Sequence, residues 1–257
     1  MPKQMPTRVL IPVTTSSPHK PDWIWGSLFH GAIIDLLPKA EANEFHISQL
    51  HPWSQYLSAD QCGNVHWVVS LLTSEMETLF DQYLFSKLPM SIYLRQKNLR
   101  VELDTPSLRI EKTFDSIYRC SEPATGGCGS MTMSFLTPTS FKQRGKEIKT
   151  PDIGLIYNSM ASQWNAFKDP EVAMMDLSAE KRASVCSAVK ILNDETREEA
   201  FSVNGSDVPG FVGKLRFRCD HEDICRDLKR LVSFATFSGI GRKTSLGMGG
   251  VAAGIFL

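Results

Sequence analysis

The apolar and polar positions of the first hundred residues fall into runs that predict alternating strands and helices. Residues 44–51 alternate in polarity, as a half-buried strand does. From Asp22, a residue type that caps helices, apolar side chains recur at helical spacing until Pro38. The predicted elements are strands 8–13, 44–51 and 65–72, helices 22–37 and 74–86, and short strands 90–93 and 99–103. This β-α-β-β-α-β order is that of a ferredoxin-like domain.

A second cycle of elements follows residues 121–130, a predicted linker that holds two adjacent glycines and a proline. The apolar stripe of one later helix contains Ile224, Leu228 and Leu231. The predicted elements are strand 131–136, helix 155–167, strands 183–192 and 213–219, helix 223–237 and a final strand 251–257. The repeated order predicts an α+β protein of tandem ferredoxin-like (RRM-like) domains, residues 1–124 and 125–257. Each is expected to be an antiparallel sheet with helices on one face, with a cleft between the two sheets.

Composition and charge narrow the class of protein. The chain has 257 residues of which 42% are apolar, enough for the cores of two small domains. Its 28 basic and 28 acidic residues cancel, so nucleic-acid binding would require a local basic patch. No apolar run approaches the length of a membrane span. The six cysteines lack paired spacing and the first residues lack the apolar core of a signal peptide, so we expect reduced thiols in a cytoplasmic protein.

The segment 238–250 has five glycines within twelve residues. Glycine permits positive φ and close backbone approach, so such a segment can direct successive N–H groups at an anion, with Arg242 and Lys243 adding charge. A flexible turn before the final strand would have the same composition. The segment is not a Walker loop, because it lacks the preceding strand and following helix. The predicted RNA-binding residues here are Gly239, Gly241, Arg242, Lys243, Thr244, Ser245, Gly247 and Gly249.

Basic residues also gather on two other parts of the second domain. The predicted RNA-binding residues are Lys142, Arg144 and Lys146, with Lys149 nearby, and Arg216 and Arg218 on one face of a strand. Each alone would be an ordinary solvated charge, but together they predict an RNA-binding stripe on a neutral protein. Cys219, His221 and Cys225 are closely spaced, yet a zinc site needs a fourth ligand, so we expect structural thiols and no metal or other cofactor.

Four stretches, in order along almost the whole chain, are similar to motifs of one family. They are residues 28–32 (LFHGA), 135–141 (FLTPTSF), 210–213 (GFVG) and 239–249 (GIGRKTSLGMG). With them the chain resembles the CRISPR-associated repeat-RNA endoribonucleases of the RAMP superfamily. The resemblance implies that CRISPR repeat RNA is the substrate. It also implies that precursor crRNA is cut within the repeat without a metal, leaving a 2′,3′-cyclic phosphate and a 5′-hydroxyl.

Metal-free cleavage of RNA requires a group that takes the proton of the 2′-hydroxyl and another that supplies one to the leaving oxygen. Histidine suits both tasks near neutral pH. The resemblance places the catalytic histidine at His30. His51, at a predicted strand end, is the competing or second candidate, and His46 alternates with apolar neighbours and is interpreted as structural.

Many members of the family pair their histidine with a tyrosine and a lysine, and here the sequence departs from that pattern. Trp23 and Trp25 stand where the aromatic hydroxyl is expected, and they are interpreted as packing residues. The role of the tyrosine is then unfilled, or it is taken by Tyr56 or by Ser27. The nearest lysines are Lys20 before the predicted helix and Lys39 after it, and Lys39 is taken as the catalytic candidate.

Three functions remain open from the sequence. The first is the endoribonuclease, a monomer or homodimer. The second is a non-catalytic RNA-binding subunit that holds crRNA among the subunits of a CRISPR effector complex, which the missing tyrosine favours and His30 opposes. A tandem ferredoxin-like protein unrelated to CRISPR would leave the four ordered motifs as coincidence.

Overall fold

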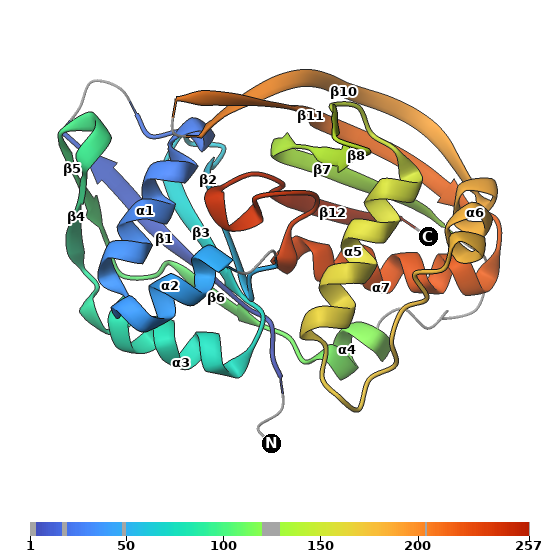
Figure 1. Ribbon diagram of the computed structural model, residues 1–257, viewed down its shortest axis with the longest axis horizontal. Coiled ribbons are helices and arrows are strands. Elements are labelled where there is room, and N and C mark those ends of the chain that lie inside the picture. The colour runs from blue at the N-terminus through green and yellow to red at the C-terminus, as the bar shows by residue number, and fades with distance from the viewer. Residues whose placement is uncertain (1–3, 17–19, 48–49, 120–128, 204, 257) are drawn as a thin grey trace.

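The computed structural model describes residues 4–16, 20–47, 50–119, 129–203 and 205–256 (Figure 1). The described residues form two main antiparallel sheets, one from each half, and a separate two-stranded sheet; helices cover one face of each main sheet. Within the described residues, no helix is long and apolar enough to cross a membrane. The predicted tandem ferredoxin-like fold is confirmed, as the strand orders below show.

The N-terminal half contains a six-stranded sheet in the order β2-β3-β1-β5-β4, with β6 also paired to β1. Alternate residues of β1, Val9, Ile11 and Val13, are buried beneath α1 and α3, as the period of a half-buried strand requires. The elements are β1 (Thr7–Thr15), α1 (Gly26–Leu36), α2 (Lys39–Ile47), β2 (Trp53–Ala59), β3 (Val65–Leu71), α3 (Ser74–Tyr83), β4 (Met90–Leu94), β5 (Leu99–Leu103), β6 (Leu108–Glu111) and α4 (Phe114–Arg119).

The C-terminal half contains a four-stranded sheet in the order β10-β11-β7-β12. The order is the ferredoxin-like one, because the two central strands are the first and third of the four. Its elements are β7 (Ser130–Thr139), β8 (Phe141–Gln143), β9 (Lys146–Ile148), α5 (Ile153–Phe167), α6 (Ala179–Ala188), β10 (Val189–Val203), β11 (Ser206–Cys219), α7 (Glu222–Ser238) and β12 (Val251–Phe256). Helices α5 and α7 cover one face of the sheet (Figure 1).

Two predicted strands are wrong. Residues 44–51 were expected to be extended, but helix α2 continues to Ile47 and the pairing strand begins at Trp53. The residues after Pro38 are mainly alanine, glutamate and lysine, which favour a helix. Residues 183–192 were also expected to be a strand. Ser178 instead caps α6, its hydroxyl accepting from the Lys181 N–H, and the strand begins only at Val189.

The domain boundary predicted at residues 124 and 125 lies outside the described residues, as does most of the predicted linker. Helix α4, before that boundary, contributes Phe114 and Ile117 to the core of the C-terminal half. The core of the N-terminal half is a separate cluster formed by residues of β1 to β5, α1 and α3. The chain therefore begins to build its second core before the predicted linker.

The two halves meet where the long hairpin β10–β11 reaches across to the start of α1 (Figure 1). Phe201 of β10 is fully buried there and stacks on Trp23, while Trp25 is buried in the N-terminal core. Ser27 donates to the Ser202 carbonyl at 3.2 Å. These contacts fix the first turn of α1 relative to the C-terminal half, and the packing roles expected of both tryptophans agree with them.

Candidate active site

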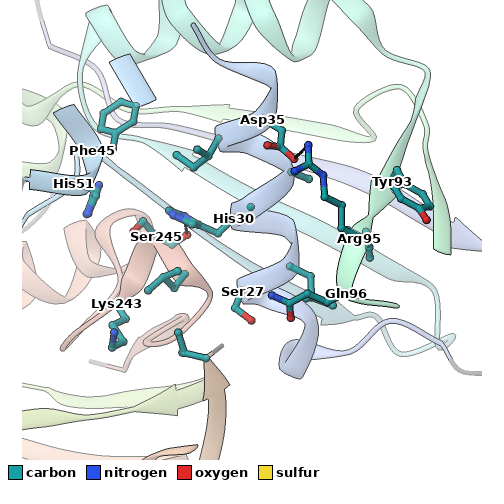
Figure 2. Close-up of a pocket in the computed structure, with 17 residues that line it drawn as sticks. Ser27, His30, Asp35, Phe45, His51, Tyr93, Arg95, Gln96, Lys243 and Ser245 are labelled. Carbon is teal, nitrogen blue, oxygen red and sulfur yellow. Dashed lines mark hydrogen bonds and ion pairs between the residues drawn. The ribbon is translucent and has the colours of Figure 1, made fainter. Parts of the chain in front are cut away.

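A cavity of about 520 Å³ lies between α1, the turn Arg95–Lys97 after β4, and the glycine-rich loop of residues 238–250 (Figure 2). Its walls bring together His30, His51, Lys243 and Ser245, which the sequence separates widely. The cavity is open to solvent and large enough for one nucleotide, since small-ligand sites measure about 300–1,000 Å³. The predicted histidines therefore share one site with part of the glycine-rich loop.

His30 is held by a backbone carbonyl. Its Nδ1 lies 3.0 Å from the carbonyl oxygen of Ser245. Because a carbonyl oxygen only accepts, Nδ1 must carry the proton of this hydrogen bond. In the neutral ring the lone pair is then on Nε2, which can take a proton, and in the charged ring Nε2 can donate one. The contact thus fixes the tautomer that acid–base chemistry at the cavity requires.

The indole ring of Trp53 packs against the rings of both His30 and His51. Its indole is fully buried and lies almost parallel to the His30 ring, with centroids 5.3 Å apart and an interplanar angle of 7°. His51 contacts the edge of the same indole at 6.3 Å. An indole face attracts a positive charge, so the stacking favours the imidazolium that forms when His30 takes a proton. It also restricts rotation of the ring out of the cavity.

Gln55 links the carbonyl that holds His30 to two other elements. Its Nε2 donates to Ser245 O at 3.0 Å and to Gly26 O at 2.9 Å, and its Oε1 accepts from the Trp67 indole N–H at 2.9 Å. Since an indole nitrogen only donates, the amide orientation is fixed. The fully buried Gln55 therefore joins β2, β3, α1 and the glycine-rich loop into one rigid unit behind the active-site cavity.

The N–H groups of the glycine-rich loop point mainly into the protein. Gly241 N–H donates to Ser159 Oγ at 2.7 Å and Gly249 N–H to the Pro138 carbonyl at 3.0 Å. Others that donate to protein oxygens belong to Gly239, Ile240, Arg242, Leu246, Gly247, Met248 and Gly250. The expectation that successive amides face an anion is thus corrected for these positions, because their N–H groups are already paired. The glycines instead allow the loop to pack tightly.

One of these close contacts joins the loop to α1. Gly247 has φ of +108°, and a Cβ there would lie 2.8 Å from the Cα of Gly26. Next to this contact, Lys243 adopts the left-handed conformation with φ of +60° and lines the cavity, and it makes no ion pair with any described residue. Arg242 turns away and binds the Glu147 carboxylate at 2.5 and 2.6 Å. Lys243 is therefore the loop's cation at the histidines.

Comparison with known proteins agrees with this geometry. Residues 133–251 match the family model described as CRISPR-associated endoribonuclease Cas6. A Mycobacterium tuberculosis protein of that name is 29% identical over 88% of this chain and 70% of its own length. A Streptococcus thermophilus protein of the same name is 27% identical over 87% of this chain and 88% of its own length. The chain is therefore similar to Cas6 endoribonucleases over most of its length.

Solved Cas6 structures have the same fold. A Cas6 protein in a product complex matches with a TM-score of 0.75 at 20% identity, covering 98% of this chain and 99% of that chain. Thermus thermophilus Cas6 matches with a TM-score of 0.67 at 19% identity, covering 97% of this chain and 98% of that chain. The tandem ferredoxin-like arrangement is therefore that of Cas6 proteins.

Several predicted site residues lie away from the cavity. Lys39 is exposed at the start of α2 and does not line it. Tyr56 is buried on the other side of the sheet against Gly250, and burial raises the pKa of its phenol above the ordinary value. Ser27, the other proposed substitute for the tyrosine, does line the cavity. The side chain of His46 lies outside what the structure describes.

The predicted basic stripe is spread over two surfaces. Lys142, Arg144 and Lys146 are exposed on the β8–β9 hairpin, which Arg242 ties to the glycine-rich loop through Glu147. Arg216 and Arg218 lie on the exposed face of β11, where Arg216 donates to Ser130 and Arg218 pairs with Asp220. Lys149 pairs with Glu198 at 2.6 Å. Among the described residues, no group of histidine, cysteine and acidic side chains is arranged to hold a metal ion.

Some residues of this site were missed by the sequence analysis. Trp53 and Gln55 fall in a segment to which no element was assigned, and Tyr93, Arg95 and Gln96 were taken as strand end and turn. A polar glutamine between Trp53 and Leu57 in an apolar strand is a usable signal, since a buried amide must have partners. The Ser245 carbonyl has no signal, because every residue has one.

Proposed function

We propose that the chain binds CRISPR repeat RNA and cleaves precursor crRNA within the repeat. The observation that carries this proposal is the His30–Ser245 hydrogen bond at the wall of an open cavity, which prepares Nε2 for proton transfer. Similarity to the Cas6 family model and to curated Cas6 endoribonucleases supports the reaction class, and solved Cas6 structures of the same fold are described in product and substrate-mimic complexes. The proposed site residues are His30, His51 and Lys243.

The proposed reaction proceeds by internal transesterification. The ribose 2′-oxygen attacks the adjacent phosphorus, a bond forms between O2′ and phosphorus, and the bond from phosphorus to the 5′-oxygen breaks. One histidine takes the 2′-hydroxyl proton and another proton carrier supplies one to the 5′-oxygen. The products are a 2′,3′-cyclic phosphate and a 5′-hydroxyl. His30 and His51, which contact the same indole, are the proposed pair.

Lys243 has a separate proposed role. The phosphorus passes through a state with extra negative charge on its oxygens, and a nearby cation stabilises that state more than the ground state. Lys243 reaches the cavity from a loop that is anchored by buried hydrogen bonds, so its position changes little on binding. Lys39, the lysine expected from the sequence, would have to act from outside the cavity.

The proposed RNA-binding surface extends from the cavity along the C-terminal half. Lys142, Arg144 and Lys146 form a basic hairpin beside the glycine-rich loop, and Arg216 lies on the open face of β11. We propose that these groups bind phosphates of the repeat. The protein is also proposed to act in the cytoplasm, as a monomer or homodimer, and to pass its product to subunits of a CRISPR effector complex.

The test is cleavage of a labelled repeat RNA from the source genome in the presence of EDTA. His30→Ala is expected to lower the single-turnover rate by about 100-fold or more, while binding of a repeat with a 2′-deoxy group at the cut position stays within a factor of about three. His51→Ala and Lys243→Ala are expected to slow cleavage less. Lys39→Ala, outside the cavity, is the matched control.

Two results would contradict the proposal. Cleavage by His30→Ala at the wild-type rate would remove His30 from the reaction. Tight binding with no cleavage by the wild-type protein would instead support the guide-holding subunit. That second function is favoured by one observation, since Tyr56 is buried away from the cavity and cannot supply the tyrosine that many family members use.

A further inference from the structure

The active-site cavity continues past the histidines to the other side of α1. Beyond the helix it is lined by Tyr93, Arg95 and Gln96, which come from β4 and the turn that follows it (Figure 2). The floor between the two sides is the outer surface of α1 itself, formed by Ser27 and Gly31. Cleavage chemistry at His30 needs only the first side. The proposed reaction therefore gives no role to the part of the cavity beyond α1.

Packing against the described residues gives no reason for a glycine at position 31. Glycine inside a helix is less favourable than alanine by roughly 0.5–1 kcal/mol. The other two helical glycines described have a packing reason, since a Cβ on Gly26 would meet Gly247 at 2.9 Å and one on Gly154 would meet Cys186 at 3.1 Å. A Cβ on Gly31 would have no neighbour within 4 Å. The space above Gly31 is thus left open by the helix, and no described residue fills it.

The side chains beyond Gly31 suit a nucleotide. Gln96 is exposed in the cavity and hydrogen-bonds to no described residue, so its amide can donate to and accept from the edge of a base. Tyr93 is 47% exposed and offers a ring on which a base can stack. Arg95 pairs with Asp35 at 3.2 Å, but both side chains are largely exposed, and such a pair is weak enough for a phosphate to replace.

We propose that the RNA strand crosses α1 directly over Gly31, and that Gln96 and Tyr93 bind the base of the nucleotide next to the cleaved phosphate. This inference rests on the proposed function, because it takes the cut position to be at His30. It assigns Gly31 as a positioning residue whose missing side chain admits the RNA backbone. A side chain at this position would displace the strand from His30 without disturbing the fold.

The experiment compares Gly31→Ala and Gly31→Leu with the wild-type protein. Both variants are expected to keep or raise the melting temperature, since a helix former replaces glycine where nothing is crowded. Gly31→Leu is expected to lower the single-turnover cleavage rate by about 100-fold at saturating repeat RNA, with Gly31→Ala intermediate, because displacement by about 1 Å has effects of that size. Ser187→Leu, on the exposed face of α6 and outside the cavity, is the matched control.

A second arm tests the base-binding residues. Each base flanking the cut is replaced in turn, and cleavage is measured with the wild-type protein and with Gln96→Ala. One replacement is expected to slow the wild-type protein by about tenfold and to have little further effect on Gln96→Ala, which identifies a direct contact. Equal effects of every replacement on both proteins would overturn the assignment of Gln96.

The outcomes separate this inference from the proposed function. If Gly31→Leu cleaves at the wild-type rate while His30→Ala does not cleave, the path over α1 is wrong and the catalytic assignment stands. If His30→Ala cleaves normally while Gly31→Leu is slow and stably folded, the path stands and the catalytic assignment fails. A large fall in the melting temperature of Gly31→Ala would show that Gly31 is required by the fold, which overturns the inference.

Discussion

At the scale of single residues, Gln55 connects stability to the geometry of the site. It satisfies the carbonyls of Gly26 and Ser245 and the indole N–H of Trp67 from a fully buried position. Each of these partners would lose a hydrogen bond if the amide were removed, and none has access to water. The residue that orients His30 through Ser245 is therefore one that the fold also needs.

Gln55→Leu is expected to lower the free energy of unfolding by about 2–4 kcal/mol, because it leaves buried polar groups unpaired. It is also expected to slow cleavage beyond any effect of unfolding, since the Ser245 carbonyl loses the donor that fixes it. Urea denaturation and cleavage by the folded fraction measure the two effects. Gln82→Leu, at an exposed position of α3, is the control. An unchanged stability would show that water replaces the amide.

The ion pair between Glu147 and Arg242 predicts a dependence of stability on pH. The Arg242 guanidinium lowers the pKa of Glu147 below its ordinary value. A carboxyl whose pKa is depressed by folding adds stability above its unfolded pKa, and that stability is lost as pH falls through the folded pKa. Glu147→Gln is expected to cost about 1 kcal/mol at neutral pH, because the pair is partly exposed.

The measurement is the free energy of unfolding of wild type and Glu147→Gln from about pH 7 to pH 3. The difference between the two proteins is expected to shrink as pH falls, because the wild-type carboxyl becomes protonated and resembles the glutamine. A difference that stays constant across this range would mean that the contact is not electrostatic. Glu180→Gln, exposed on α6, controls for the general effect of removing one negative charge.

At the scale of elements, the glycine-rich loop and the first turn of α1 form one interface. Gly247 meets Gly26 backbone to backbone, and Phe201 of the β10–β11 hairpin closes the same contact. His30 is one turn further along α1 and Ser245 two residues earlier in the loop. Any change that separates these backbones should therefore move the His30 ring away from the carbonyl that holds it.

Gly247→Ala is expected to cost about 3 kcal/mol or more and to abolish most cleavage, because a Cβ would lie 2.8 Å from the Gly26 Cα. The matched control is Gly145→Ala. Gly145 has a similar left-handed backbone, with φ of +81°, but a Cβ there would meet nothing within 4 Å. This control should show only the conformational cost of about 1–2 kcal/mol. Equal losses for the two variants would exclude the contact as the cause.

The fold was largely predictable from the sequence because buried elements keep their period. The apolar stripe identified helix α7, and the alternation of apolar and polar residues identified strand β11. The repeated order of strands and helices predicted the tandem arrangement of two domains. The start of β10 was misassigned because that strand is at a sheet edge, with most of its charged residues exposed, so it carries no apolar alternation. In the site, the family resemblance identified His30 and the charge of the glycine-rich segment identified Lys243, whereas Ser245 is proposed to act through its backbone carbonyl and Gly31 through its lack of a side chain.

At the scale of the whole molecule, equal numbers of acidic and basic residues mean that RNA binding depends on where the charges lie. Many arginines and lysines are paired, as Arg109 is with Glu77, Asp81 and Glu111. Lys142 and Lys146 are exposed on the β8–β9 hairpin, which the Arg242–Glu147 ion pair joins to the glycine-rich loop. RNA binding should therefore be strongly salt-dependent although the protein has no net charge.

The last prediction concerns that salt dependence. The logarithm of the association constant for non-cleavable repeat RNA is expected to fall linearly with the logarithm of the salt concentration, since each phosphate contact releases a counterion. Replacing both Lys142 and Lys146 by alanine is expected to reduce the slope by about 1.4–1.8, depending on whether the contacted RNA is single-stranded or paired. Replacing Lys87 and Lys112, which are exposed on the N-terminal half away from the cavity, removes the same charge and should leave the slope unchanged. Equal changes in the two double variants would mean that total charge governs binding, and a flat dependence in the wild-type protein would mean that the hairpin does not contact phosphates.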